Sequence, residues 1–271
     1  MSNREDMSTG IAIYGIDPTR VAAILEIAES LFRRLGEEVS EVIFIEFGAR
    51  DGAKIIEDHK ISISDLRKGV SDGGIVAFQI CSNGKDGGVP VISLGCNNQK
   101  FGGISFVDVQ IEESIYKIRA EIERFFENFV ARLGCKYAIA YDAKDYSTAY
   151  KYSTGVNLIR IFPFENTSLF TRELPGRAPG AASYERVKLR MIYPLNVLNE
   201  EHLEIRVGDL SLREWITADS CRGYLKSISN RMWLWSVKET DLAEINNACG
   251  EAGILIAWKK ASTDRAVRKL P

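Results

Sequence analysis

Two long segments of helical hydrophobic period constrain this chain most. Apolar residues recur at three- and four-residue steps over residues 21–35 and again over residues 115–133. Gly36 and Gly134 follow directly and predict where each helix ends. Between them stand short β-branched runs, typical of strands, at residues 11–16, 42–47, 75–80, 89–94, 104–111 and 137–141. We expect an α+β fold, a mixed and mostly antiparallel sheet covered by the two long amphipathic helices.

The chain changes character after about residue 142. Residues 142–154 are polar, rich in tyrosine and without a period, and residues 173–183 contain two Pro-Gly turns. Beyond them, Asn199 and Ser211 predict the starts of two short helices, and Thr240 that of a third. Expected strands cover residues 187–193, 223–228, 232–237 and 254–258. We therefore expect an N-terminal α+β domain, residues 1–145, and a smaller C-terminal α+β domain, residues 146–271, which alternatively pack as one continuous unit.

Two helix starts in the first part are predicted from local signals. Asp17 is expected to cap the first long helix, with Pro18 at its first position. One helical turn is expected within residues 61–70, capped by Ser64 or Asp65.

Composition limits the compartment and the partners. The 271 residues are 45% apolar, with 35 Lys and Arg against 37 Asp and Glu, a net charge of −2. Such a chain lacks the positive excess of a histone-like or ribosomal-type binder. The five cysteines are widely spaced and include no Cys-x-x-Cys pair, which favours free thiols. No signal-peptide pattern and no run of roughly 20 apolar residues is present. We expect a cytoplasmic protein without a membrane partner.

The chain is poor in residues that carry catalysis. It has two histidines: His59 is expected in a solvated polar loop and His202 in a capped helix. The zinc, EF-hand and zinc-protease patterns are missing from the sequence. The glycines near Lys85 do not form a phosphate-binding loop, because Gln79 stands where the first glycine belongs and Asp86 follows the lysine. We expect no catalytic residue, no metal and no cofactor.

The densest acidic stretch lies between residues 37 and 58. It consists of Glu37, Glu38, Glu41, Glu46, Asp51, Glu57 and Asp58. A solvated edge would account for it, whereas the functional interpretation is a negative surface that steers and binds a basic partner. The charge is uneven along the chain, −6 over the first 150 residues and +4 over the rest. Trp233 and Trp235 alternate along an expected strand, which favours core packing for both.

The last third carries a recognisable pattern. It comprises Arg190–Leu203 (RMIYPLNVLNEEHL), Gly208, Ser211–Ile216 (SLREWI), Gly223–Leu225, Trp235–Val237 and Ala252–Leu255. The pattern resembles the closing portion of immunity proteins encoded beside contact-delivered or type VI bacterial toxins. The resemblance implies a cytosolic protein that binds one cognate toxin and blocks its active site or the approach of its substrate. It transfers no functional residues.

We therefore expect a non-enzymatic binding protein, an immunity protein that neutralises a basic toxin and uses the acidic stretch as its contact surface. Two alternatives stay open. One is an enzyme with a carboxylate-based site, such as a hydrolase or a nucleotide-modifying enzyme. The other is a nucleic-acid-associated accessory protein that uses the positively charged second part, with a steep dependence of binding on salt.

Overall fold

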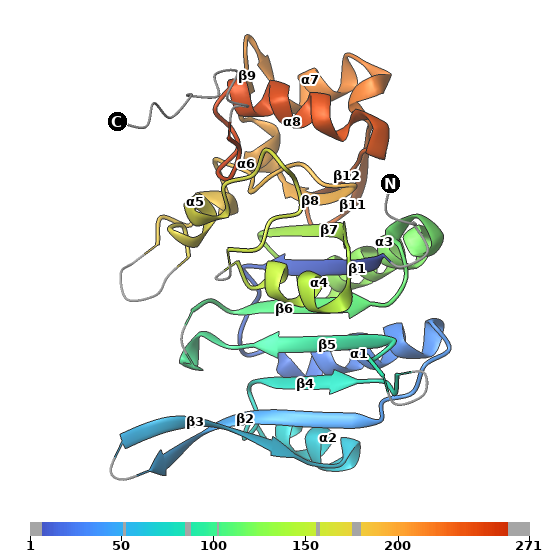
Figure 1. The fold of residues 1–271 in the computed structure, drawn as a ribbon, viewed down its shortest axis with the longest axis vertical. Helices are drawn as coiled ribbons and strands as arrows, with labels where there is room; N and C mark the ends of the chain where they lie inside the picture. Colours follow the sequence, from blue (N-terminus) through green and yellow to red (C-terminus); the bar gives the residue numbers. More distant parts are fainter. Residues whose placement is uncertain are drawn as a thin grey trace, which may run out of the picture.

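A single ten-stranded antiparallel sheet organises the molecule (Figure 1). The computed structural model describes residues 7–50, 53–84, 88–101, 103–155, 158–174 and 180–259. The strands lie in the order β11-β12-β8-β7-β1-β6-β5-β4-β2-β3. Their bounds are β1 (Ser8–Tyr14), β2 (Glu41–Arg50), β3 (Ala53–Lys60), β4 (Phe78–Cys81), β5 (Ile92–Asn97), β6 (Phe106–Ile111), β7 (Tyr137–Ala143), β8 (Leu195–Asn199), β11 (Tyr224–Ser229) and β12 (Met232–Ser236). The short strands β9 (Arg206–Val207) and β10 (Leu210–Ser211) form a separate pair.

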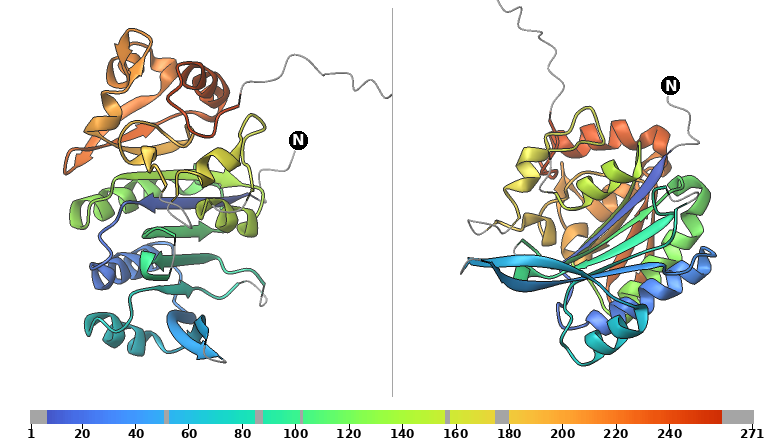
Figure 2. Two further views of the ribbon diagram at one scale, coloured as in Figure 1. Left: turned by 90° about the vertical axis from the view of Figure 1, so that its left-hand side faces the viewer. Right: turned by 60° about the horizontal axis from the view of Figure 1, so that its bottom comes forward.

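Helices lie on both faces of the sheet, as the right-hand view of Figure 2 shows. On one face the apolar sides of α1 (Val21–Arg34), α2 (Ile63–Ser71) and α3 (Ile115–Arg132) form the first core. On the other face α4 (Tyr146–Ser153) lies against β1 and β6. The C-terminal segments complete the second core there, with α5 (Thr167–Thr171), α6 (Glu200–Leu203), α7 (Leu212–Thr217) and α8 (Leu242–Glu251).

The expected α+β fold, with a largely antiparallel sheet and the two long helices on one face, is confirmed. The helix ends follow the glycines, since Gly36 and Gly134 both adopt positive φ, +76° and +72°. The capping boxes at Asn199 and Ser211 are present. The hairpin predicted at residues 223–237 is β11–β12.

The sheet runs without interruption across residue 145. Strand β7 pairs with β8 through three residue pairs, so segments of both expected domains share one set of hydrogen-bonded strands. The division into residues 1–145 and 146–271 therefore stays a prediction about folding units.

Several local predictions are wrong. Residues 187–193 and 254–258 are irregular, joined by one isolated bridge between Leu189 and Leu255, and most of their side chains from Leu189 onward are buried. Asp17 forms a turn with Thr19, and α1 begins only at Val21 without a side-chain cap. Ser62, and not Ser64 or Asp65, caps α2. Strand β3 and helix α4 were not predicted.

Candidate functional site

One half of the sheet carries helices on a single face. Val42 and Phe44 of β2 point into the core under α1 and α2. Their neighbours therefore point the opposite way, because side chains alternate along a strand. In Figure 1 this opposite side of β3, β2 and β4 faces the viewer without a covering helix. We call it the open face, and it carries Glu41, Ile43, Ile45, Phe47, Lys54, Ile56, Asp58 and Lys60.

The centre of the open face is apolar and accessible. Ile43, Ile45 and Phe47 are half-buried, and Ile56 opposite Phe47 is 52% exposed. Tyr150 of α4, 40% exposed, borders the open face. Contiguous apolar side chains of this kind on a protein surface mark sites where another molecule binds.

Charged side chains surround this apolar centre. Glu41 and Lys60 form an ion pair of 2.5 Å, and the ammonium of Lys54 lies 3.6 Å from the centre of the Phe47 ring. Asp58 is exposed and makes no ion pair within the part of the chain that the structure describes. Burial raises the pKa of the Tyr150 hydroxyl, and the negative charges of Asp108 and Asp58 raise it further. The open face is therefore apolar at its centre and has an unpaired negative charge beside it.

The acidic residues predicted from the sequence do not form one surface. Glu41 and Asp58 lie on the open face, whereas Glu46 and Glu57 lie on the opposite face of the β2–β3 hairpin. Glu37 and Glu38 belong to the connection between α1 and β2, and Asp51 lies outside the described residues.

The expectation that His59 sits in a solvated loop is wrong. It stands in β3, where its ring stacks on Phe44 at 5.1 Å and its Nε2 lies 3.0 Å from the Glu46 carboxylate. It therefore belongs to the face opposite the open face, with Glu46 and Glu57.

A buried polar row lies next to the open face. Asp108 of β6 accepts hydrogen bonds from Asn97 at 2.7 Å and Gln110 at 2.8 Å. Ser93 donates to Gln110 at 2.6 Å and accepts from Tyr146 of α4 at 2.6 Å. Burial raises the pKa of Asp108 to about 6. These bonds attach α4 to β5 and β6, and so fix where the covered part of the sheet ends.

A cleft of about 760 Å³ lies between α4, residues 158–164 and α8. Its candidate acid is Asp142, whose carboxylate accepts from the Ile115 amide at 2.8 Å and the Ser114 hydroxyl at 3.0 Å. Burial raises the pKa of Asp142. Because both of its oxygens accept hydrogen bonds from the start of α3, the burial of Asp142 is explained by its role in holding that helix.

A buried arginine organises the second core. Arg190 is 1% exposed, donates to the Tyr14 hydroxyl at 3.1 Å and to the Tyr152 carbonyl at 3.0 Å, and stacks on the Tyr152 ring. Tyr152 donates to the buried Glu165 at 2.7 Å and shares a hydrogen bond with Tyr193. The sequence signal for this cluster is weak, since only the tyrosine-rich composition of residues 142–154 hints at it.

His202 and the tryptophans are structural. His202 donates to the Tyr184 carbonyl at 2.8 Å, and burial lowers its pKa to about 4. Trp235 is fully buried and Trp233 packs against the same core, so the core packing predicted for this pair is confirmed.

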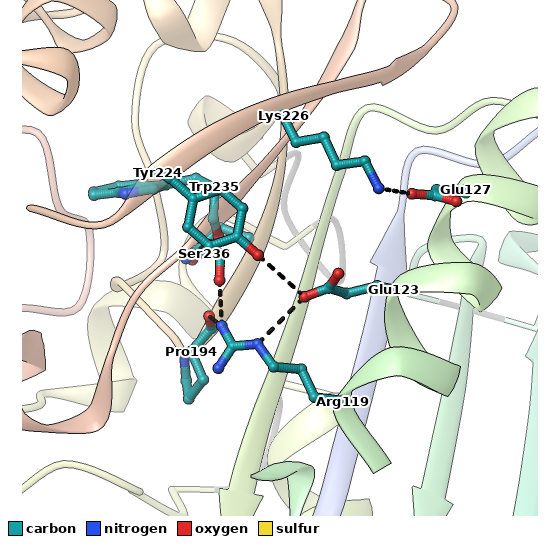
Figure 3. A network of polar contacts seen from close by, with 9 residues as sticks. Arg119, Glu123, Glu127, Pro194, Tyr224, Lys226, Trp235 and Ser236 are labelled. Atoms are coloured by element: carbon teal, nitrogen blue, oxygen red, sulfur yellow. Dashed lines mark hydrogen bonds and ion pairs between the residues drawn. The ribbon is translucent and has the colours of Figure 1, made fainter. Parts of the chain in front are cut away.

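A polar network joins the C-terminal strands to α3 (Figure 3). Arg119 donates to the Pro194 carbonyl at 3.2 Å and to the Ser236 hydroxyl, and it pairs with Glu123 at 3.3 Å. Further along the helix, Lys226 of β11 pairs with Glu127 at 2.5 Å. The network fastens the β11 edge of the sheet to a helix of the first core.

The described residues add three findings on chemistry. They contain no group of three His, Cys, Asp or Glu side chains placed to hold a metal ion. They contain no helix with the length and hydropathy of a membrane-spanning segment. Between residues 146 and 259 they include thirteen Lys and Arg against thirteen Asp and Glu, so the positive excess of the second part lies in sequence outside them.

Comparison with known proteins gives a shared fold. No protein-family model matches the chain, and no curated protein matches it. A solved T6SS protein of Pseudomonas aeruginosa superposes with a TM-score of 0.55 at 12% identity, over 96% of this chain and 77% of that chain. A chain in the structure of the toxic C-terminal tip of CdiA from Pseudomonas aeruginosa in complex with immune protein gives a TM-score of 0.29 at 13% identity, over 49% of this chain and 84% of that chain. The first similarity shows the fold alone, and the second is too low to carry an argument.

Proposed function

We propose that this chain is an immunity protein that binds a protein toxin directly, without catalysis, through the open face. The observation that carries the proposal is the open face itself, an accessible apolar surface beside an unpaired carboxylate on a rigid sheet. Apolar and aromatic side chains at the centre of an interface supply most of its binding energy, and charges at its rim select the partner.

Two further observations support a toxin as the partner. The C-terminal third resembles immunity proteins in its sequence pattern, and the whole chain shares its fold with a T6SS protein. Of the acidic residues that the sequence singled out, we propose Glu41 and Asp58 as contacts, because they alone among the described ones lie on the open face. A basic toxin would fit them.

The test is protection from a toxin. The chain is expressed together with the toxin domain encoded by the gene adjacent to its own, and growth is measured. We expect full rescue and a stable complex on size-exclusion chromatography. If the toxin domains encoded by the genes on both sides of its own are neither neutralised nor bound, the proposal is wrong. Turnover of a nucleotide or ester by the purified chain, abolished by Asp142→Asn, would instead favour the enzyme alternative.

A further inference from the structure

A small pocket opens on the open face at the base of the β2–β3 hairpin. It has a volume of about 280 Å³. Its apolar lining residues are Ile45, Ile56, Phe101, Ile104, Phe106 and Leu174. Pockets for drug-sized ligands are about 300–1,000 Å³. This one therefore lies at the small end of that range. We call it the hairpin pocket.

The pocket exists because the hairpin extends past its neighbour. Strand β4 pairs with β2 only from Glu41 to Phe44, and beyond that point Ala77 contributes a carbonyl to Ile45 but almost no side chain. Figure 1 shows the end of β2 and the start of β3 projecting beyond the neighbouring strands of the sheet. Phe47 contacts Phe101 at 4.8 Å, which supports the hairpin from the β5–β6 connection. The ring of Phe101, which lines the pocket, is therefore packed against a ring of the hairpin.

Charges of both signs flank Ile56 on this face: Asp58 two residues further along β3, and Lys54 two residues before it, with its ammonium over the Phe47 ring. Asp58 stands directly across the ladder from Ile45 and on the same side of β3 as Ile56, so it is a direct neighbour of two residues that line the pocket. The other acid of the open face, Glu41, is neutralised by Lys60. Asp58 is therefore the charge available to a cationic group on the open face as the structure describes it.

We propose that the hairpin pocket receives a large apolar side chain from a surface loop of the toxin, and that Asp58 pairs with a Lys or Arg of the same loop. This inference rests on the proposed function. The small apolar pocket accommodates a side chain of a protein partner, and the exposed carboxylate of Asp58 next to its lining residues suits a cationic neighbour. An apolar anchor in a formed pocket next to a charge pair is the arrangement that concentrates binding energy in a few residues.

The test measures the affinity of single variants for the toxin domain encoded beside this chain. Ile56→Asp places a charge in the pocket wall, and we expect the affinity to fall at least about 30-fold. Asp58→Asn keeps the shape and removes the charge, and we expect a loss of about 10-fold, mostly in the association rate, with a weaker dependence on salt. Asp58→Lys should bind more weakly still, and replacement of one toxin Lys or Arg by Glu should restore its binding.

Glu57→Gln is the matched control, because Glu57 is the neighbour of Asp58 on the same strand but points to the opposite face. It should bind like the parent protein. Thermal unfolding of each variant reports on folding, and if Ile56→Asp unfolds, the exposed Asp58 variants decide alone. A toxin that binds the Asp58 and Ile56 variants as tightly as the parent overturns this inference and the open face as the contact surface, and leaves only the proposed binding and neutralisation of a toxin standing. Absence of any complex with the parent protein overturns both. Self-association of the parent chain that Ile56→Asp abolishes would assign the pocket to a second copy and overturn the inference.

Discussion

Asp108 makes the stability of the protein depend on pH in an unusual direction. The carboxyl is 1% exposed and its pKa is raised to about 6 by burial, although Asn97 and Gln110 both donate hydrogen bonds to it. An unfolded chain ionises an aspartate near its ordinary pKa of 3.8. The folded state therefore holds the proton more tightly than the unfolded state, and ionisation of Asp108 favours unfolding.

The size of the effect follows from linkage. The difference between about 6 and 3.8 corresponds to about 3 kcal/mol, since each factor of ten in a proton equilibrium is about 1.4 kcal/mol. Below pH 4 this cost is nearly absent, it grows between pH 4 and pH 6, and it is complete above pH 6. The Asp108 contribution should thus lower the free energy of unfolding by about 2–3 kcal/mol between pH 4 and pH 8.

The assay compares the parent protein with Asp108→Asn, which is neutral at every pH. Urea unfolding followed by tryptophan fluorescence gives the free energy of unfolding of each at several values of pH. Their difference isolates Asp108, because all other titrating groups are shared. The parent should lose about 2–3 kcal/mol relative to Asp108→Asn as the pH rises from 4 to 8.

Asp145→Asn serves as the control whose difference from the parent protein stays nearly constant from pH 4 to pH 8. Asp145 caps α4 by accepting from the Thr148 amide at 2.6 Å, and this hydrogen bond lowers its pKa. Its stabilisation is present above its ordinary pKa and is lost as the pH falls. A difference between parent and Asp108→Asn that stays constant from pH 4 to pH 8 would refute the reasoning about Asp108.

Two further predictions concern the second core and the thiols. Arg190→Met removes the buried cation from Tyr14, Tyr152 and the nearby Glu165, and should lower the free energy of unfolding by about 3–5 kcal/mol. Adding Glu165→Gln should recover part of this loss, because it removes the carboxylate that Arg190 neutralises. Losses of the two substitutions that simply add in the urea midpoints would contradict an interaction between Arg190 and Glu165. Burial raises the pKa of the Cys96 and Cys249 thiols to about 12, whereas Cys221 is exposed. Ellman's reagent should therefore react rapidly with Cys221 in the native protein and with all five cysteines after unfolding. A rapid reaction of the native Cys221→Ser variant would count against this burial pattern.

The sequence predicted those elements whose burial has a regular period. Helices α1 and α3 bury one side each, so their apolar spacing was visible. Strand β3 was missed because it is an edge strand, hydrogen-bonded to β2 alone, and its residues Glu57 to Lys60 show no apolar alternation. Residues 254–258 were wrongly predicted as a strand. They are apolar because they fill the second core, but they pair with other segments only through isolated bridges.

The candidate site could be predicted only in part. Acidic composition pointed to residues 37–58, which include Glu41 and Asp58 of the open face. Which acids share a face depends on the register of a hairpin that was not predicted, because a shift of one residue exchanges the two faces. The hairpin pocket combines Ile45 and Ile56 with Phe101, which is distant in sequence, so no local sequence pattern predicts it.

The position of β1 bears on how the protein is made. This strand lies between β6 and β7, so its hydrogen-bonding partners emerge from the ribosome about a hundred residues after it does. At about 5–20 residues per second, the first strand waits roughly 5–20 s before either partner exists. The middle of the sheet thus forms late in synthesis. A nascent chain interrupted before residue 106 has neither partner strand of β1, and it leaves exposed a segment whose residues are all buried in the folded protein.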